Sequence, residues 1–322
     1  MSTYKPPYTI TSKMLKMVGE ISEIVTEIEF TQKLRITPKL RKENRVKSLT
    51  GSLQIEGNTL TQEEITAIID GKLVMGKVQE IKEVEGAIVA YNHIDSYDYR
   101  ELEDLLLAHK LMMNGLLKTA GKFRRDSVGV FGKHGVTHLA PPSDRVSYLM
   151  KSLFQWLQTS DDHKLIVSSV FHYEFEFIHP FSDGNGRIGR LWQTVILQQY
   201  KRIFSIVPVE AMVRENQQKY YDALSKSSKT GESTIFVEFM LDIILNSLKK
   251  FAKEHRKSNQ KSNQKIIALM RKNPKTTIAQ LSAKTGLSLS GVKKVIGKLK
   301  SENRLKRIGS NKGGQWEVVD DA

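Results

Sequence analysis

Apolar residues recur every three or four positions over most of the first 250 residues, which is the repeat of an amphipathic helix. The segments with this pattern are 15–28, 40–55, 78–94, 102–119, 145–157, 165–178, 187–200, 217–225 and 235–251. Thr61 and Glu64 have the spacing of a capping box, which predicts one more helix after Thr61. The fold is therefore expected to be mainly α.

One stretch breaks the helical pattern. Between Ser127 and Pro142 the valines and glycines favour two short strands around a turn, closed by Pro141 and Pro142. We therefore expect a small β-hairpin within an otherwise helical core.

The segment 179–190, His-Pro-Phe-Ser-Asp-Gly-Asn-Gly-Arg-Ile-Gly-Arg, lies between two predicted helices. Pro180 disfavours a helical conformation at His179, so the first helix should end there. The glycines leave backbone N–H groups unobstructed, and the start of the next helix attracts phosphate. The segment thus predicts an anion-binding turn at a helix N-terminus.

Charged side chains in this segment point to phosphate chemistry. Arg187 and Arg190 are three apart and share one helix face, which suits two contacts to one anion. Asp183 offers the oxygen ligand that Mg²⁺ prefers, and His179 can take a proton near neutral pH. The combination favours phosphoryl or nucleotidyl transfer.

Other site classes are absent from the sequence. It has no Gly-x-x-x-x-Gly-Lys-Ser/Thr loop and no His-Glu-x-x-His motif. It also has no cysteine, which excludes disulfides, thiolate nucleophiles and Cys-ligated zinc. The first residues lack a signal-peptide pattern and no apolar run could span a membrane, so we expect a cytoplasmic protein.

The twelve residues HPFSDGNGRIGR resemble the signature of the Fic family, H-x-F-x-[DE]-G-N-G-R-x-x-R, at every defined position. Fic proteins are helical enzymes, and most of them transfer AMP from ATP to a Ser, Thr or Tyr hydroxyl of a protein. The resemblance therefore implies a protein adenylyltransferase that uses ATP and Mg²⁺.

The family pattern implies a role for each matched residue. His179 would deprotonate the acceptor hydroxyl, Asp183 would hold Mg²⁺, and the hairpin would lay a target segment beside the site by strand addition. Tyr220 and Tyr221 match a tyrosine pair of the adenine pocket, although one of them could equally be plain helix core. The residues expected to contact ATP are Gly184, Asn185, Gly186, Arg187, Gly189, Arg190, Tyr220 and Tyr221.

Glu56 forms a second feature. Gly57 and Asn58 are a helix-ending signal, which places Glu56 in a last turn where a negative charge opposes the helix dipole. Ser52 lies four residues earlier on the same face. Glu56 is thus expected to have a basic partner, unless it is simply exposed at a small cost.

The segment 52–57 also resembles the Fic inhibitory motif, [ST]-x-x-x-E-[GN]. In that family the glutamate pairs with the second arginine of the signature, here Arg190, and displaces the γ-phosphate of ATP. The resemblance implies an autoinhibited enzyme of the class whose inhibitory helix precedes the signature, with Ser52 and Glu56 as inhibitory residues.

The positive charge is concentrated at the C-terminal end. The net charge is +15, and from Lys253 to Ala322 there are 17 Lys and Arg against 5 Asp and Glu. Three short helical patterns followed by two strands around a glycine turn are the organisation of a winged helix-turn-helix. The candidate DNA contacts are Lys293, Lys294, Lys298 and Lys312. Two alternatives to DNA binding stay open. Winged helices also serve as protein-docking modules, and lysine-rich surfaces are often only solvated.

The chain is accordingly divided into an N-terminal helical region with the inhibitory helix around 45–57 (1–112), a Fic core (113–250), a linker (251–262) and a winged helix-turn-helix (263–322). Three functions stay open: AMP transfer to a protein, which includes the chain itself; DNA-binding regulation with the Fic core as nucleotide sensor; and removal of AMP from a modified protein. A homodimer would suit both regulation and DNA binding.

Overall fold

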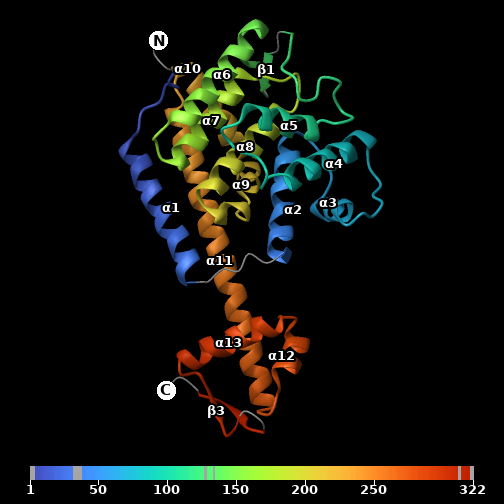
Figure 1. The fold of residues 1–322 in the computed structure, drawn as a ribbon, viewed down its shortest axis with the longest axis vertical. Helices are drawn as coiled ribbons and strands as arrows, with labels where there is room; N and C mark the ends of the chain where they lie inside the picture. Colours follow the sequence, from blue (N-terminus) through green and yellow to red (C-terminus); the bar gives the residue numbers. More distant parts are fainter. Residues whose placement is uncertain (1–3, 32–37, 127–128, 133–134, 311–312, 320–322) are drawn as a thin grey trace. The chain divides into compact units, whose positions relative to one another are not determined.

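The computed structural model describes residues 4–31, 38–126, 129–132, 135–310 and 313–319. The chain divides into two compact units, Met1–Lys249 and Lys250–Ala322. Figure 1 shows both units as helical, and each also contains a two-stranded antiparallel sheet. The mainly α fold with a small hairpin and a C-terminal winged helix is thereby confirmed.

The elements of the first unit follow the predicted helices closely. They are α1 (Ser12–Thr31), α2 (Pro38–Ile55), α3 (Gln62–Ile69), α4 (Val78–Asn92), α5 (Leu102–Met112), β1 (Gly129–Gly132), β2 (Gly135–Leu139), α6 (Ser143–Thr159), α7 (Lys164–Ile178), α8 (Asn185–Tyr200), η1 (Arg202–Ser205), α9 (Val209–Glu215) and α10 (Gln217–Thr230). α5 ends before Thr119 because Gly115 takes a positive φ of 74° soon after Met112. Thr61 and Glu64 form the capping box, with both reciprocal hydrogen bonds present.

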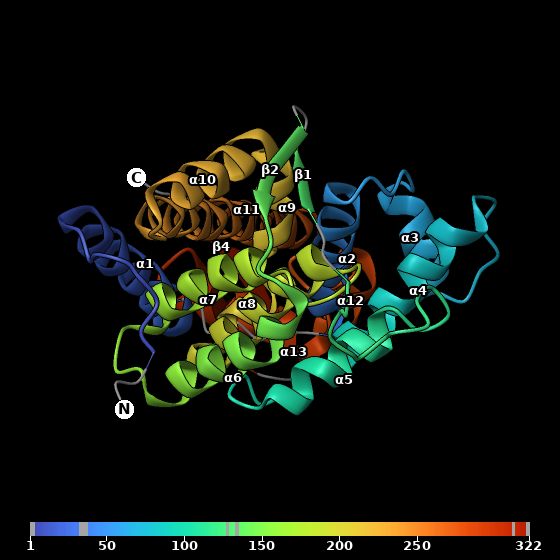
Figure 2. The same ribbon diagram turned by 90° about the horizontal axis from the view of Figure 1, so that it is seen from above.

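Helices α7 and α8 form the centre of this unit. Figure 2 shows them surrounded by α1, α2, α5, α6, α10 and α11 (Thr234–Lys272). Side chains of α7 and α8 such as Phe171, Phe175 and Trp192 are fully buried. The turn between these two helices, residues 179–184, is therefore anchored at both ends by the best packed part of the unit.

Helix α2 is fixed against the centre by a buried carboxylate. Glu210 of α9 accepts hydrogen bonds from Ser48 of α2 (2.7 Å), Tyr91 of α4 (3.2 Å) and Thr194 of α8 (2.8 Å). A Cβ at Gly51 would lie 2.8 Å from the backbone of Ala211, so only glycine lets α2 approach α9 this closely. These contacts set the position of the C-terminal turn of α2.

The hairpin lies where it was predicted. β1 pairs with β2, with Gly129 opposite Leu139 and Gly132 opposite Gly135. Residues 127–128 and 133–134 lie outside the described residues.

The C-terminal unit contains the end of α11, α12 (Ile278–Thr285), α13 (Leu289–Ser301), β3 (Leu305–Ile308) and β4 (Gln315–Val318). Its own core includes Ile266, Met270, Leu281, Val292 and Leu299, each with no exposed surface. α12 ends at Gly286 in the left-handed conformation and Ser288 caps α13, which makes the turn between the two helices.

Residues 251–262, whose polarity was interpreted as that of a linker or of the frayed start of a helix, belong to α11. Polarity does not end a helix, because Lys, Arg and Gln are good helix formers and the segment holds no Gly or Pro. Among the described residues, no helix is long and apolar enough to cross a membrane.

Candidate active site

His179 occupies an unusual backbone position at the end of α7. Its φ and ψ are 50° and 60°, the left-handed region that residues other than glycine rarely adopt. Its N–H still donates to Phe175 O (2.9 Å), and Pro180 follows. The reversal at His179 directs the chain out of α7 and into the loop that leads to α8.

Arg124 holds this loop in place. Its guanidinium donates to the carbonyl oxygens of His179 (2.7 Å), Asp126 (2.8 Å), Pro141 (2.6 Å) and Ile178 (3.3 Å). The residue is only 3% exposed, and burial lowers the pKa of its guanidinium. The Arg124 side chain therefore joins the end of α7 to Asp126, which precedes the hairpin, and to Pro141, which follows it. No sequence pattern distinguishes the buried Arg124 from its exposed neighbour Arg125.

His109 supports the loop from α5. The N–H of Gly121 donates to Nδ1 (2.8 Å), so Nδ1 is an acceptor and the proton lies on Nε2, which donates to Asp183 O (3.0 Å). The ring stacks on Phe181 at a centroid distance of 3.6 Å. Burial lowers the pKa of His109 to about 4, which keeps it neutral in this role. The only hint in the sequence is a histidine on an apolar helix face.

Asn185 and Gly184 complete the turn. The Asn185 side chain accepts from Phe181 N (2.9 Å) and donates to Phe181 O (2.8 Å), so its amide closes the loop and does not face outward. Gly184 has φ of 83°, and a Cβ there would meet Met113 Sδ at 2.8 Å. Position 184 therefore requires glycine, and position 185 requires a side chain that both donates and accepts. Asn185 was expected to contact ATP, but its side chain is hydrogen-bonded within the loop.

Arg187 has unused hydrogen-bonding capacity. It is 4% exposed and donates through Nη2 to Asp183 at 3.2 and 3.3 Å. Its Nε and Nη1 are buried without a hydrogen-bond partner among the described residues. Buried guanidinium groups are normally satisfied, so this arrangement fits an anionic ligand at the start of α8. The Asp183 side chain is 61% exposed at the same place, and its Oδ1 also accepts a hydrogen bond from Gly184 N (2.6 Å).

Arg190 is held by the end of α2. Its Nη2 donates to Glu56 Oε1 (2.6 Å) and to Ser52 O (3.0 Å), and its Nε donates to Ser52 Oγ (3.1 Å). Ser52 and Glu56, which their four-residue spacing placed on one helix face, thus both contact Arg190. Arg190 is the partner of Glu56 that the family resemblance implied. Gly186 makes room for this pair, because a Cβ there would lie 2.9 Å from Arg190 Nη1 and closer still to Glu56 Oε1.

Glu176 was not marked by any sequence pattern. Its Oε1 is buried without a hydrogen bond among the described residues and lies 3.8 Å from His172 Nε2. Burial raises the pKa of Glu176 to about 7, against the opposing effect of Arg190. A Cβ at Gly189 would be 3.0 Å from the same oxygen, which gives Gly189 a packing role between α7 and α8.

The two tyrosines differ. Tyr220 is 2% exposed, and its hydroxyl lies 3.1 Å from His172 Nε2, whose pKa burial lowers to about 3. Tyr221 is 37% exposed, and Gln217, which also donates to Ile55 O of α2 (3.0 Å), lies 3.4 Å from its hydroxyl. Tyr220 is thus core, and Tyr221 is the one with a surface free for a ligand.

The chain is similar to known protein families and to solved structures. Residues 99–197 match the Fic/DOC family, and residues 260–306 match the winged helix-turn-helix DNA-binding family. A Fic family protein from Desulfovibrio desulfuricans G20 is 37% identical, with 99% of each chain covered and a TM-score of 0.76. The chain belongs to the Fic family. Fic-1 (residues 134–508) from C. elegans shares the fold, with a TM-score of 0.63 at 23% identity over 76% of this chain and 73% of that one.

Curated relatives carry the name "Protein adenylyltransferase Fic". The protein from Culex quinquefasciatus is 30% identical over 215 residues, and that from Drosophila erecta is 29% identical over 214 residues. The match covers 63% of this chain and 41% of each of these proteins, so the chain corresponds to less than half of their length.

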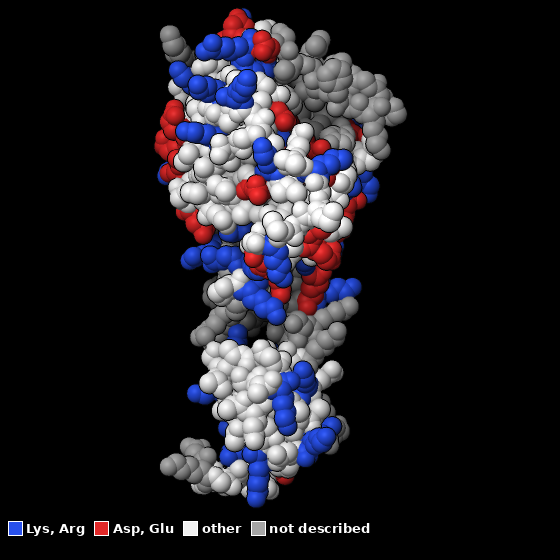
Figure 3. Space-filling view, turned by 90° about the vertical axis from the view of Figure 1, so that its right-hand side faces the viewer, with Lys and Arg blue, Asp and Glu red and all other residues white. Residues whose placement is uncertain are grey.

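The C-terminal unit carries the predicted lysines on its surface. Lys293, Lys294 and Lys298 of α13 are exposed, and Lys312 lies outside the described residues. Figure 3 shows Lys and Arg side chains spread over an otherwise mostly uncharged face of this unit, at the lower end of the view. Arg307 of β3 lies 4.6 Å and Lys300 of α13 lies 5.3 Å from the centre of the Trp316 ring of β4.

Arg124→Ala should destabilise the fold by about 1–3 kcal/mol, because it leaves buried carbonyl groups unpaired. Urea unfolding followed by circular dichroism measures this. Arg125→Ala, one residue on and exposed, is the matched control and should change stability by less than about 0.5 kcal/mol. Equal stability of the two variants would contradict the role given to Arg124.

Gly186→Ala and Glu56→Gly should be coupled, because the added methyl group collides with the Glu56 carboxylate. The alanine should cost less in the Glu56→Gly background, with a coupling energy of about 0.5–3 kcal/mol in a double-mutant cycle of unfolding. Strict additivity would show that Glu56 does not occupy this position.

Glu176→Gln should remove a pH-dependent penalty. Since burial raises the folded pKa of Glu176 to about 7 from 4.5, the wild-type carboxyl supports stability at low pH and loses this as pH rises to 7. The stability of Glu176→Gln relative to wild type should therefore increase from pH 4.5 to 7, by up to about 3 kcal/mol. A pH-independent difference would mean that Glu176 is well solvated.

Proposed function

We propose that the chain transfers AMP from Mg²⁺-bound ATP to a hydroxyl of a protein, and that Glu56 restrains this activity. The observation that carries the proposal is the turn at 179–187, which begins with His179 at the end of α7 and leads to Arg187 in the first turn of α8, where two buried Arg187 donors have no partner among the described residues. The family match and the relatives named adenylyltransferases support the same reaction.

In the proposed reaction the acceptor oxygen attacks the α-phosphorus of ATP. The bond from that phosphorus to the α,β-bridging oxygen breaks, pyrophosphate leaves, and the hydroxyl proton goes to His179. Arg187 and the N–H groups at the start of α8 hold the negative charge of the phosphates. Asp183 would hold Mg²⁺, which supplies charge neutralisation of the phosphates when bound.

The restraint follows from two effects of Glu56. Its carboxylate uses the Nη2 of Arg190, which is then not available to the terminal phosphates. It also brings a negative charge next to Gly186, at the N-terminal end of α8 where phosphate should lie. ATP then binds with its phosphates displaced from the position needed for attack on the α-phosphorus.

Labelled ATP tests both parts. Wild-type chain should put label on protein from α-³²P-ATP and not from γ-³²P-ATP, at a low rate. Glu56→Gly should raise this rate at least tenfold, and His179→Ala should reduce it to background. Label from the γ position, or an unchanged rate for Glu56→Gly, would contradict the proposal. Mass spectrometry of the product identifies the acceptor and tests whether the chain also modifies itself.

Removal of AMP from a modified protein is a second candidate. Glu56 is 36% exposed at the site, where a carboxylate could orient water toward the phosphodiester. Incubating AMP-modified product with wild-type chain distinguishes the two, because hydrolysis releases AMP without pyrophosphate and should require Glu56. Release of AMP that is faster in Glu56→Gly than in wild type would exclude this role.

We also propose that the C-terminal unit binds DNA through α13, which the winged helix-turn-helix match supports. A DNA-binding regulator whose Fic core senses nucleotide is the corresponding alternative function, and a homodimer would suit it. Affinity for duplex DNA should fall with salt, with a log–log slope of about −0.9 per neutralised phosphate.

Changing Lys293 and Lys298 to Ala should reduce that slope by about two, whereas Lys82→Ala in the first unit should leave it unchanged. Fluorescence anisotropy of the full chain with labelled duplex, from 50 to 200 mM salt, gives the slopes. A slope that is the same in all three proteins would favour docking of a protein.

A further inference from the structure

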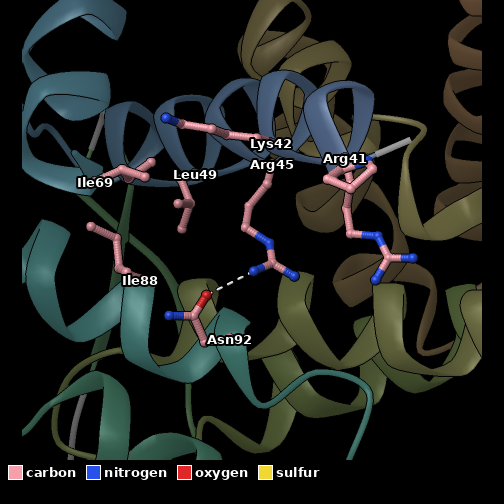
Figure 4. A pocket seen from close by; sticks show the side chains of 8 residues that line it. Arg41, Lys42, Arg45, Leu49, Ile69, Ile88 and Asn92 are labelled. Atoms are coloured by element: carbon pink, nitrogen blue, oxygen red, sulfur yellow. Dashed lines mark hydrogen bonds between the residues drawn. The ribbon is translucent and has the colours of Figure 1, made fainter. Parts of the chain in front are cut away.

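A cavity of about 380 Å³ lies between α2, α3 and α4, formed by residues outside the turn at 179–190. Its volume lies in the range of small-molecule sites, about 300–1,000 Å³. Figure 4 shows the side chains that line it, from all three helices. They are Pro38, Arg41, Lys42, Arg45, Leu49, Ile69, Ile88 and Asn92.

One side of the cavity is basic. Arg41 and Arg45 extend from α2 in the same direction (Figure 4), and Arg45 Nη1 donates to the neutral amide of Asn92 at 2.7 Å. The Nε of Arg41 is buried with no hydrogen-bond partner among the described residues. Arginines four apart on a helix repel each other, and an anion bound between them would relieve this repulsion.

Two carboxylates offset this charge only in part. Asp95 lies 3.8 Å from Arg41 and is 63% exposed, and Asp70 pairs with Lys42. Burial lowers the pKa of Arg45, while Asp95 opposes this effect. Three cations against two carboxylates leave the cavity with a positive excess that centres on Arg45.

The other side of the cavity is apolar. Leu49, Ile69 and Ile88 come from three different helices and face one another beside Arg45 (Figure 4). Leu49 is fully buried, while Ile69 and Ile88 are half-buried and so have surface left to cover. A planar arginine fork next to such a wall suits a phosphate group attached to an apolar or aromatic body.

We infer that this cavity binds a small phosphate monoester, with the phosphate on Arg41 and Arg45 and its organic part against Ile69 and Ile88. Lys42 adds charge at the rim, where its side chain is 46% exposed. The site lies outside the catalytic turn and uses none of its residues.

The position of the site gives it a regulatory consequence, which rests on the proposed function. Arg45 lies in α2, and Glu56 directly follows the last residue of that helix. The helical rise of 1.5 Å per residue separates the two by about 16 Å. A ligand that bridges α2 to α3 and α4 stabilises α2 in the position that brings Glu56 to Arg190. Occupancy should therefore strengthen the restraint on AMP transfer.

Calorimetric titration of the full chain tests the binding site, with phenyl phosphate, inorganic phosphate and phenol as probes. Phenyl phosphate should bind one to one and more tightly than either fragment. Arg45→Ala should weaken it at least tenfold, and Ile88→Ala should weaken phenyl phosphate but not inorganic phosphate. Lys39→Ala removes the same charge from the same helix outside the cavity and should have no effect.

The Arg187→Ala variant separates this site from the catalytic turn. Phenyl phosphate binding that survives Arg187→Ala and is lost in Arg45→Ala supports the inference. Binding that is lost in Arg187→Ala and unchanged in Arg45→Ala would overturn it, as would no heat of binding from phenyl phosphate at millimolar concentration. Circular dichroism confirms that each variant is folded.

AMP transfer measured with and without phenyl phosphate tests the regulatory consequence alone. The probe should lower the rate of wild type and of Lys39→Ala at least twofold, and it should not affect Arg45→Ala or Glu56→Gly. An equal rate with and without probe in wild type would overturn the proposed effect on AMP transfer. The calorimetric titration would still decide whether the cavity binds phenyl phosphate.

Discussion

The contact between Arg190 and the end of α2 is the interaction on which the site depends. Arg190 is 2% exposed, and a buried guanidinium without partners would be strongly unfavourable. Ser52 and Glu56 supply those partners, and Gly51, Gly186 and the carboxylate of Glu210 let α2 come close enough to do so. The contact that satisfies this buried charge is also the one that, in the proposed function, keeps Arg190 from a phosphate.

The catalytic turn is rigid for reasons separate from that contact. Arg124 binds carbonyl groups at the end of α7, neutral His109 binds Asp183 O, and Asn185 closes the loop on Phe181. Every one of these bonds holds backbone of the turn in place, and under the proposed function this would lower the cost of positioning ATP. Among the described residues, the Nε and Nη1 donors of Arg187 have no partner, and the proposed function assigns them to the phosphates of the nucleotide.

Much of this could be predicted because the motifs are local. Spacing placed Ser52 and Glu56 on one face, and Pro180 predicted that a helix ends at His179. Three short helical patterns followed by two strands indicated the winged helix. Arg124 and His109 could not be found, since their partners lie far away in sequence: Arg124 meets His179 and His109 meets Asp183. The amide of Asn185 hydrogen-bonds within the loop to Phe181, a use that the residue type alone does not reveal. The polar segment 251–262 is helical, because polarity does not by itself end a helix.

The account stands on Glu56 acting through Arg190, and a mutant cycle on the rate of AMP transfer tests this most directly. Wild type, Glu56→Gly, Arg190→Ala and the double variant are assayed with α-³²P-ATP under one set of conditions. The account predicts that Glu56→Gly raises the rate in the wild-type background and not in the Arg190→Ala background. An equal increase in both backgrounds would contradict it, because Glu56 would then restrain the reaction without the arginine.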